Sequence, residues 1–128
     1  MSVDPAVRDL VAAGNFAALA YHRADNTIAN HVMWVDADDD HLLINTEVHR
    51  PKFAAMEANP DVTITIWDKS NPYHYAEVHG TVVGTDDSDA ARAHIDKLSQ
   101  RYEGTAYGNP IQSRRVIVKI EPDRQRVQ

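Results

Sequence analysis

The feature that most constrains the fold is a strict alternation of apolar and polar residues between Val62 and Trp67. Valine or isoleucine stands at positions 62, 64 and 66, and Thr63 and Thr65 stand between them. This period of two places one face of an extended strand against a core and leaves the other face polar. Turn-forming residues bound the strand on both sides, at 59–61 and 70–72. Such a strand is typical of an antiparallel sheet.

The same reasoning predicts mostly strands, with three helical segments. The strands are expected at residues 15–23, 28–35, 41–46, 62–67, 73–85 and 115–120. The helices are expected between Asp4 and Gly14, from Pro51 to Ala58, and after the acidic segment 86–89. Gly80 and Gly84 inside the longest strand indicate bulges, which let a small sheet curl. The pattern is therefore mainly β with peripheral helices, and it indicates a barrel or a sandwich.

Composition is consistent with one domain spanning residues 1–128. The chain is 43% apolar, which is enough for a single core, and it carries a formal net charge of −6. This negative charge argues against a general nucleic-acid-binding protein. No apolar run approaches the length of a membrane span and no signal-peptide pattern is present, so we expect a cytoplasmic protein without membrane attachment. Without cysteine, the chain has no thiolate nucleophile and no disulfide.

The segment from Leu42 to Lys52 combines three kinds of group that bind anions. An apolar strand ends at Thr46, which offers a hydroxyl, and Arg50 and Lys52 follow where a helix begins. Pro51 suits the first helical position because its missing N–H would have no partner there, and the other N–H groups at that end are free to bind an anion. The pattern predicts a phosphate site. The alternative is a strand-to-helix turn whose two cations are only solvated.

Outside this segment the chain offers little chemistry of its own. It contains no nucleophile motif, no glycine-rich dinucleotide loop and no pair of histidines at helical zinc spacing. The aspartates between residues 36 and 40 lack the spacing, glycine and closing glutamate of a calcium loop, so we expect a solvated hairpin and no metal site. No residue is assigned as catalytic, and the chemistry is expected to come from a cofactor.

Several of these segments occur in an order that resembles a known superfamily. The segments are Asn45-Thr46 with Arg50 and Lys52, then Asn59–Trp67, then Tyr75–Thr81. They are similar to the split β-barrel flavin and deazaflavin proteins, which include pyridoxamine 5′-phosphate oxidase. The segments Ile95–Gly104 and Arg115–Pro122 resemble the actinobacterial branch that uses coenzyme F420, an 8-hydroxy-5-deazaflavin. The resemblance implies a six-stranded antiparallel split β-barrel that forms a homodimer, with cofactor sites at the interface.

The resemblance also implies how the site residues act. The cofactor phosphate would lie against Thr46, Arg50, Pro51 and Lys52, at the start of the second helix. The ring system would lie along the strand His31-Val32-Met33, with Asn45 near the same edge. Trp67 and Tyr75 would line the far side, and Tyr75 would come from the neighbouring subunit. Met33 and Trp34 alternate along a strand, so only one of them is expected to face the cofactor.

The activity implied by the resemblance is hydride transfer from C5 of reduced coenzyme F420 to an electron-poor conjugated substrate. Enones, quinones, bilin-like and polycyclic compounds are the substrate types that the family suggests. One alternative is an oxidoreductase that binds flavin mononucleotide (FMN) in the same pocket, and another is a non-catalytic flavin- or haem-binding protein. The chain ends at Gln128 without the arginine-rich segment that holds the substrate phosphate in pyridoxamine 5′-phosphate oxidase, which argues against that activity.

Overall fold

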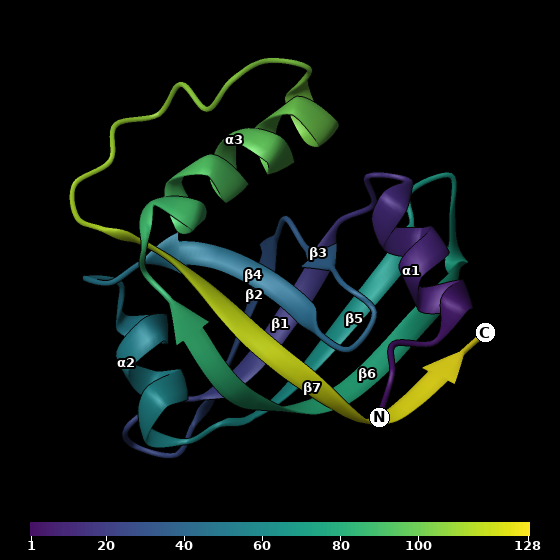
Figure 1. Cartoon of the computed structure of the whole chain (residues 1–128). Coiled ribbons are helices and arrows are strands. Elements are labelled where there is room, and N and C mark those ends of the chain that lie inside the picture. The colour runs from purple at the N-terminus through teal and green to yellow at the C-terminus, as the bar shows by residue number, and fades with distance from the viewer.

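Seven antiparallel strands form one continuous sheet in the computed structural model, which describes residues 1–128 (Figure 1). The strands are β1 (Ala17–His22), β2 (Ile28–Met33), β3 (Asp36–Ala37), β4 (Leu42–Glu47), β5 (Asp61–Asp68), β6 (Asn71–Asp86) and β7 (Arg115–Val127). The helices are α1 (Pro5–Ala12), α2 (Pro51–Ala58) and α3 (Asp89–Glu103). The expected mainly β fold is confirmed, with six longer strands and the two-residue β3 added at one edge.

The sheet curls into a barrel that stays split along one side. Its strand order is β2-β1-β5-β6-β7-β4-β3. Strand β2 is therefore one edge strand, and the short β3, next to β4, is the other. No hydrogen bonds join β2 to β4, and β2 pairs only with β1. One edge of β2 therefore has no partner strand. Helix α3 and the long connection after it lie over the upper end of β4 and β7 (Figure 1).

The predicted bulges at the two glycines of β6 are confirmed. The register between β6 and β7 shifts between His79 and Gly80, and again between Val82 and Gly84. A β-carbon on Gly80 would lie 2.7 Å from the carbonyl oxygen of Glu121, whereas one on Gly84 would meet nothing within 4 Å. Gly80 is thus required by the close approach of β7, and the bulges bend the long strand so that the sheet can curl.

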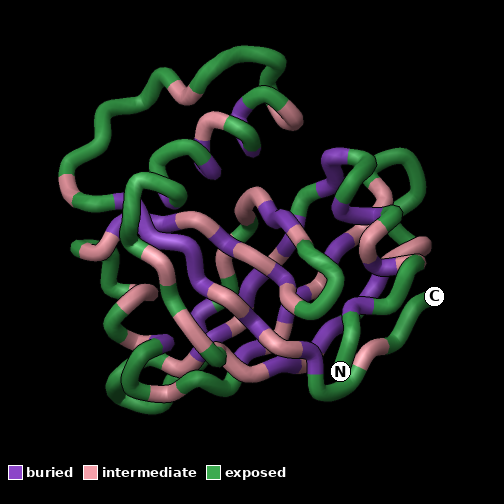
Figure 2. Tube along the Cα trace, viewed as in Figure 1, coloured by how far each residue is buried: buried purple, intermediate pink, exposed green.

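The core lies inside the curled sheet and beneath α1. It contains 19 buried apolar residues, among them the alternating Val62, Ile64 and Ile66 of β5, as the sequence predicts. Figure 2 shows the buried positions following the strands, while α3 is buried only on the face toward the sheet. The connection between α3 and β7 is almost entirely exposed (Figure 2).

The helices begin and end as their capping residues predict. The Asp4 carboxylate accepts a hydrogen bond from the Ala6 N–H at 2.8 Å, and the Ser88 hydroxyl accepts one from the Ala90 N–H at 3.3 Å. Gly104 ends α3 in the left-handed conformation, with φ of 75°. The bounds of α2 agree with the sequence prediction. None of the helices is both long and apolar enough to cross a membrane.

The largest difference from the predicted elements is the length of β7. The strand was expected to end at Ile120, but it continues to Val127. Pro122 lies opposite Gly80, at the bulge, where its missing N–H interrupts the ladder least. Beyond the bulge the pairing with β6 resumes and places Arg124 opposite His79, so proline did not end the strand.

Candidate functional site

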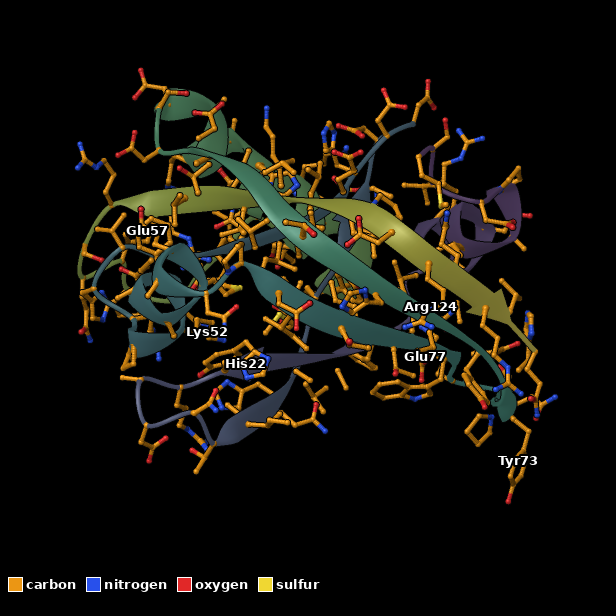
Figure 3. All side chains as sticks on the ribbon, turned by 90° about the horizontal axis from the view of Figure 1, so that it is seen from below. His22, Lys52, Glu57, Tyr73, Glu77 and Arg124 are labelled. Carbon is orange, nitrogen blue, oxygen red and sulfur yellow. The ribbon has the colours of Figure 1, made fainter.

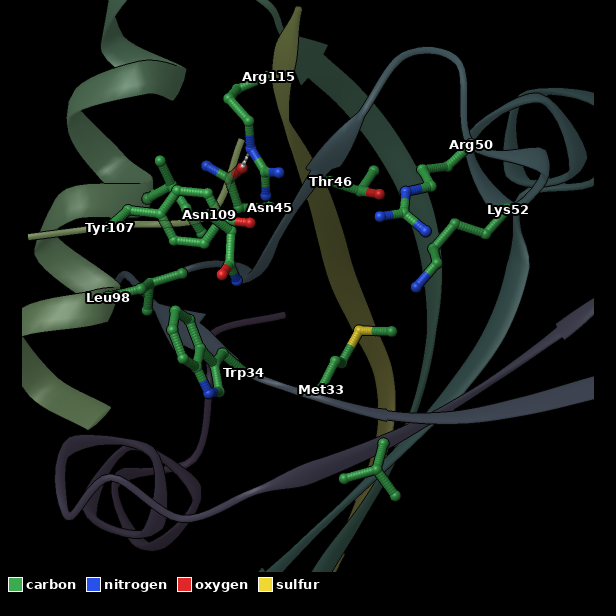
Figure 4. Close-up of a pocket in the computed structure, with 12 residues that line it drawn as sticks. Met33, Trp34, Asn45, Thr46, Arg50, Lys52, Leu98, Tyr107, Asn109 and Arg115 are labelled. Atoms are coloured by element: carbon green, nitrogen blue, oxygen red, sulfur yellow. Dashed lines mark hydrogen bonds between the residues drawn. The ribbon is translucent and has the colours of Figure 1, made fainter. Parts of the chain in front are cut away.

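A cleft of about 360 Å³ opens where the barrel is split, between the end of β2 and strand β4 (Figure 4). Helix α3 and the connection that follows it form a third wall. The lining residues are Val32, Met33, Trp34, Asn45, Thr46, Arg50, Lys52, Ile95, Leu98, Tyr107, Asn109 and Arg115. A cleft with apolar walls and a few convergent polar groups is the usual form of a small-molecule site.

One end of the cleft carries two cations without acidic partners. Arg50 and Lys52 flank the start of α2, and neither takes part in any ion pair of the chain. Burial lowers the pKa of Lys52, and the charges of Arg50 and Arg115 lower it further. Thr46 lies beside these two side chains (Figure 4). Without a counter-charge, this end of the cleft is suited to an anion.

The other end of the cleft contains a third cation that is paired. Arg115 is buried, its Nε–H donates to Asn45 Oδ1 at 2.8 Å, and its Nη1 lies 3.6 Å from Glu47 Oε2. Its guanidinium also lies over the Tyr107 ring, 5.3 Å from the ring centre. Burial alone would raise the pKa of Glu47, but hydrogen bonds from two backbone N–H groups and the charge of Arg115 lower it. Glu47 is therefore ionised and offsets the charge of Arg115.

Stacked aromatic rings form the wall nearest α3. The Trp34 and Tyr102 rings are almost parallel, at 4° and 5.1 Å between centres, and Tyr107 meets Trp34 edge-on. The Tyr102 hydroxyl accepts from the Val35 N–H at 3.2 Å and donates to the Asn15 carbonyl at 2.6 Å. These bonds attach α3 to the segment before β1 and to the segment after β2, which contains Trp34.

The connection between α3 and β7 is anchored where it passes the cleft. Glu47 Oε1 accepts hydrogen bonds from the N–H groups of Gln112 and Ser113, both at 2.7 Å. The Tyr107 N–H donates to Asp96 on α3 at 3.0 Å. The connection of eleven residues without regular structure, 104–114, is thereby held in place, and it contributes Tyr107 and Asn109 to the cleft.

Six of the predicted site residues line the cleft, namely Val32, Met33, Asn45, Thr46, Arg50 and Lys52. Both Met33 and Trp34 line it, although only one was expected to, because β2 ends at Met33 and the alternation of side chains stops there. Met33 also packs against the core. The Asn45 amide is already engaged, since its Nδ2 donates to the Ala91 carbonyl at 2.9 Å and to His94 Nδ1 at 3.0 Å.

The other four predicted residues do not line the cleft within one chain. His31 packs edge-on against Tyr21, with ring centres 5.4 Å apart. Pro51 lies between the two cations but lines a separate groove between α2 and the turn after β1. Trp67 and Tyr75 lie opposite each other on β5 and β6, near the turn that joins these strands. Figure 3 places that end, marked by Tyr73, on the opposite side of the molecule from Lys52.

Sequence reasoning did not assign several residues of the cleft as ligand-binding. Ile95 and Leu98 were expected as the buried face of α3, and they also reach the cleft. Asn109 carries no local signal in the sequence. Arg115 does carry a signal in the sequence, since a charged residue at the start of the apolar run 115–120 requires a buried polar partner. That partner cannot be identified from the sequence.

Residues 3–128 match the family model described as pyridoxamine 5′-phosphate oxidase, and this range includes every strand and helix. No curated protein matches the chain.

Several solved structures share the fold. One described as an F420 reductase is 30% identical with a TM-score of 0.85, over 97% of this chain and 98% of that one. A conserved hypothetical protein from Mycobacterium tuberculosis is 19% identical with a TM-score of 0.77, over 98% and 84% of the two chains. General Stress Protein 26 from Bacillus anthracis is 20% identical with a TM-score of 0.73, over 95% and 90%. The last two similarities concern the fold alone.

Proposed function

The chain belongs to the pyridoxamine 5′-phosphate oxidase family, and we propose that it is a reductase that uses reduced coenzyme F420 to reduce an electron-poor conjugated compound. Enones, quinones, bilin-like and polycyclic molecules are the proposed substrate types. The 30% identity to an F420 reductase over 97% of the chain is the observation that carries this choice of cofactor.

The cationic end of the cleft fits the phosphate of such a cofactor. Arg50 and Lys52 have no carboxylate partner, and burial together with neighbouring positive charge lowers the pKa of Lys52. A bound phosphate would supply the missing counter-charge. We assign its binding to Arg50, Lys52, the Thr46 hydroxyl and the Lys52 backbone N–H at the start of α2.

The remaining walls fit a flat ring system. The unpaired edge of β2 offers backbone groups to the polar edge of a ring, and Met33 and Trp34 offer apolar surface to its faces. When bound, the reduced deazaflavin would supply a hydride from C5 to the substrate. The chain itself would orient the two molecules and exclude water from between them.

A second copy of the chain completes the site in this proposal. The cleft is open to solvent, and Trp67 and Tyr75, which were expected on its far side, lie elsewhere in the same chain. They reach a cleft only if another copy supplies them. We therefore propose a homodimer with two sites at its interface.

The test is a fluorescence titration of the purified protein with oxidised coenzyme F420, with FMN as competitor. Binding at micromolar concentration or tighter that FMN does not displace would support the reductase. Tight binding of FMN alone would refute the choice of cofactor and favour a flavin-dependent oxidoreductase. If neither binds, the proposed function is wrong. Where coenzyme F420 binds, turnover of enones and quinones by the loaded protein would identify the substrate class.

A further inference from the structure

A chain of buried hydrogen bonds leads from β3 to the wall of the cleft. Asp36, on β3, lies 3.0 Å from His94 Nε2, and His94 Nδ1 lies 3.0 Å from the amide nitrogen of Asn45. Asn45 Oδ1 in turn accepts from Arg115 Nε at 2.8 Å. The side chains of Asp36 and His94 are only 3% and 8% exposed, so water cannot replace these bonds.

The direction of each bond in this chain follows from its neighbours. The Asn45 amide nitrogen also donates to the Ala91 carbonyl, and Arg115 Nε can only donate, so the oxygen of Asn45 must face Arg115. His94 Nδ1 therefore accepts, and its proton is on Nε2, where it donates to Asp36. The alternative tautomer would place two donors opposite each other. Asp36 thus selects the tautomer that turns the Asn45 oxygen toward Arg115.

Asp36 is ionised at neutral pH. Burial alone would raise the pKa of Asp36, but hydrogen bonds from His94 and the Ala37 N–H, with the charge of Arg101, bring it well below its usual range. Lys97 Nζ and Arg101 Nη1 lie 3.1 and 3.0 Å from its two oxygens. The acceptor for His94 is therefore permanent.

We propose that Asp36 and His94 are positioning residues which, through Asn45, fix the guanidinium of Arg115 as a donor to a carbonyl oxygen of the bound ligand. Arg115 donates from Nε to Asn45, its Nη1 lies 3.6 Å from Glu47 Oε2, and its side chain lines the cleft. A guanidinium has five N–H donors, more than these two contacts use. Glu47 offsets its charge, so this end of the cleft favours a neutral or partly charged oxygen, whereas Arg50 and Lys52 favour a full anion. The carbonyl comes either from the deazaflavin ring or from the substrate, and this part of the inference builds on the proposed function.

Two substitutions at one position separate positioning from a purely structural role. His94→Asn keeps an acceptor at the Nδ1 position for Asn45 and loses the bond to Asp36, whereas His94→Gln keeps a donor at the Nε2 position and loses the acceptor. We expect His94→Gln to weaken binding of oxidised coenzyme F420 roughly tenfold, and His94→Asn to leave it within about threefold. Thermal stability should fall more in His94→Asn. His41→Gln is a matched control, since His41 pairs with Asp38 outside the cleft.

Nuclear magnetic resonance supplies a measurement that needs no ligand. The Arg115 Nε–H signal should exchange slowly with water in the wild type and in His94→Asn, and rapidly in His94→Gln. Long-range nitrogen spectra of the wild type should show the His94 proton on Nε2, which tests the proposal even if neither variant folds. A proton on Nδ1, or an Arg115 signal in His94→Gln identical to that of the wild type, would overturn it.

The ligand measurements separate the two sources of the carbonyl. A weaker affinity for oxidised coenzyme F420 in His94→Gln assigns the carbonyl to the cofactor ring. An unchanged affinity with a raised KM for an enone assigns it to the substrate, and no change in either quantity refutes the ligand-binding role. If the wild type binds no coenzyme, the proposed function fails, while the Arg115 signal still decides whether Asp36 and His94 position this residue.

Discussion

Removal of the two unpaired cations is the most direct perturbation of the cleft. Arg50→Ala and Lys52→Ala, singly and together, should weaken coenzyme binding without destabilising the fold. Neither side chain is paired with a carboxylate, so truncation leaves no buried acid without a partner. The pKa of Lys52 is lowered by burial and by two arginines, so its charge is unfavourable in the free protein. The free energy of unfolding should therefore stay constant or rise slightly.

The size of the effect on binding follows from the contacts expected at a phosphate. A hydrogen bond to a charged group contributes about 1.5–3 kcal/mol, which corresponds to roughly a tenfold to hundredfold change in affinity. Each truncation also removes the repulsion between the two cations in the free protein, so the single variants should lie near the lower limit. We expect about tenfold for each and about a hundredfold for the double variant.

The assay is fluorescence titration with oxidised coenzyme F420 at low and moderate ionic strength. Salt should weaken binding of the wild type more than that of the double variant, since added ions screen the contribution of the two cations. Arg8→Ala is a control, because Arg8 lies on α1, pairs with Asp39 and does not line the cleft. Equal affinity of the wild type and the double variant, with the fold intact, would refute the phosphate site.

Four further substitutions test the scaffold of the cleft by measurements of stability. Gly80→Ala should lower the melting temperature strongly, because the added β-carbon would lie 2.7 Å from a carbonyl oxygen of β7. Gly84→Ala is the control and should leave the melting temperature nearly unchanged, because its β-carbon would meet nothing within 4 Å. Equal effects of the two substitutions would contradict the close approach of β7 to Gly80. Tyr102→Phe should cost about 1–3 kcal/mol, since the lost hydroxyl leaves two backbone groups without a partner. Asp36 has a lowered pKa in the folded state, so its contribution to stability is complete above its unfolded pKa near 3.8 and declines as the pH falls below it. Asp36→Asn should therefore flatten the acid limb of the stability curve, and an unchanged slope would contradict this assignment.

Features that depend on a few neighbouring residues were predictable from the sequence. The alternation in β5, the start of α2 at Pro51 and the bulges at Gly80 and Gly84 are all confirmed. Each depends on backbone geometry or side-chain periodicity within a few positions. The grouping of Thr46, Arg50 and Lys52 was predictable for the same reason, because β4 ends at Glu47 and α2 begins at Pro51, only four positions later.

The length of β7 and the positions of Trp67 and Tyr75 in the fold could not be predicted from neighbouring residues. Whether Pro122 ends a strand depends on the bulge across from it in β6, not on its own neighbours. Trp67 and Tyr75 are aromatic residues of the kind that can line a cofactor site. The pairing of β5 with β6 nevertheless places them opposite each other, near a turn far from α2 (Figure 3).

By itself, the sequence determined the antiparallel sheet, the helix ends and the turn that groups Thr46, Arg50 and Lys52, because these arise from contacts between residues close in the chain. Only the tertiary structure decided the other half of the cleft. Arg115 meets Asn45 across 70 positions, and His94 meets Asp36 across 58. A buried charge requires a partner within hydrogen-bonding distance, and the tertiary fold rather than the local sequence decides which residue that partner is.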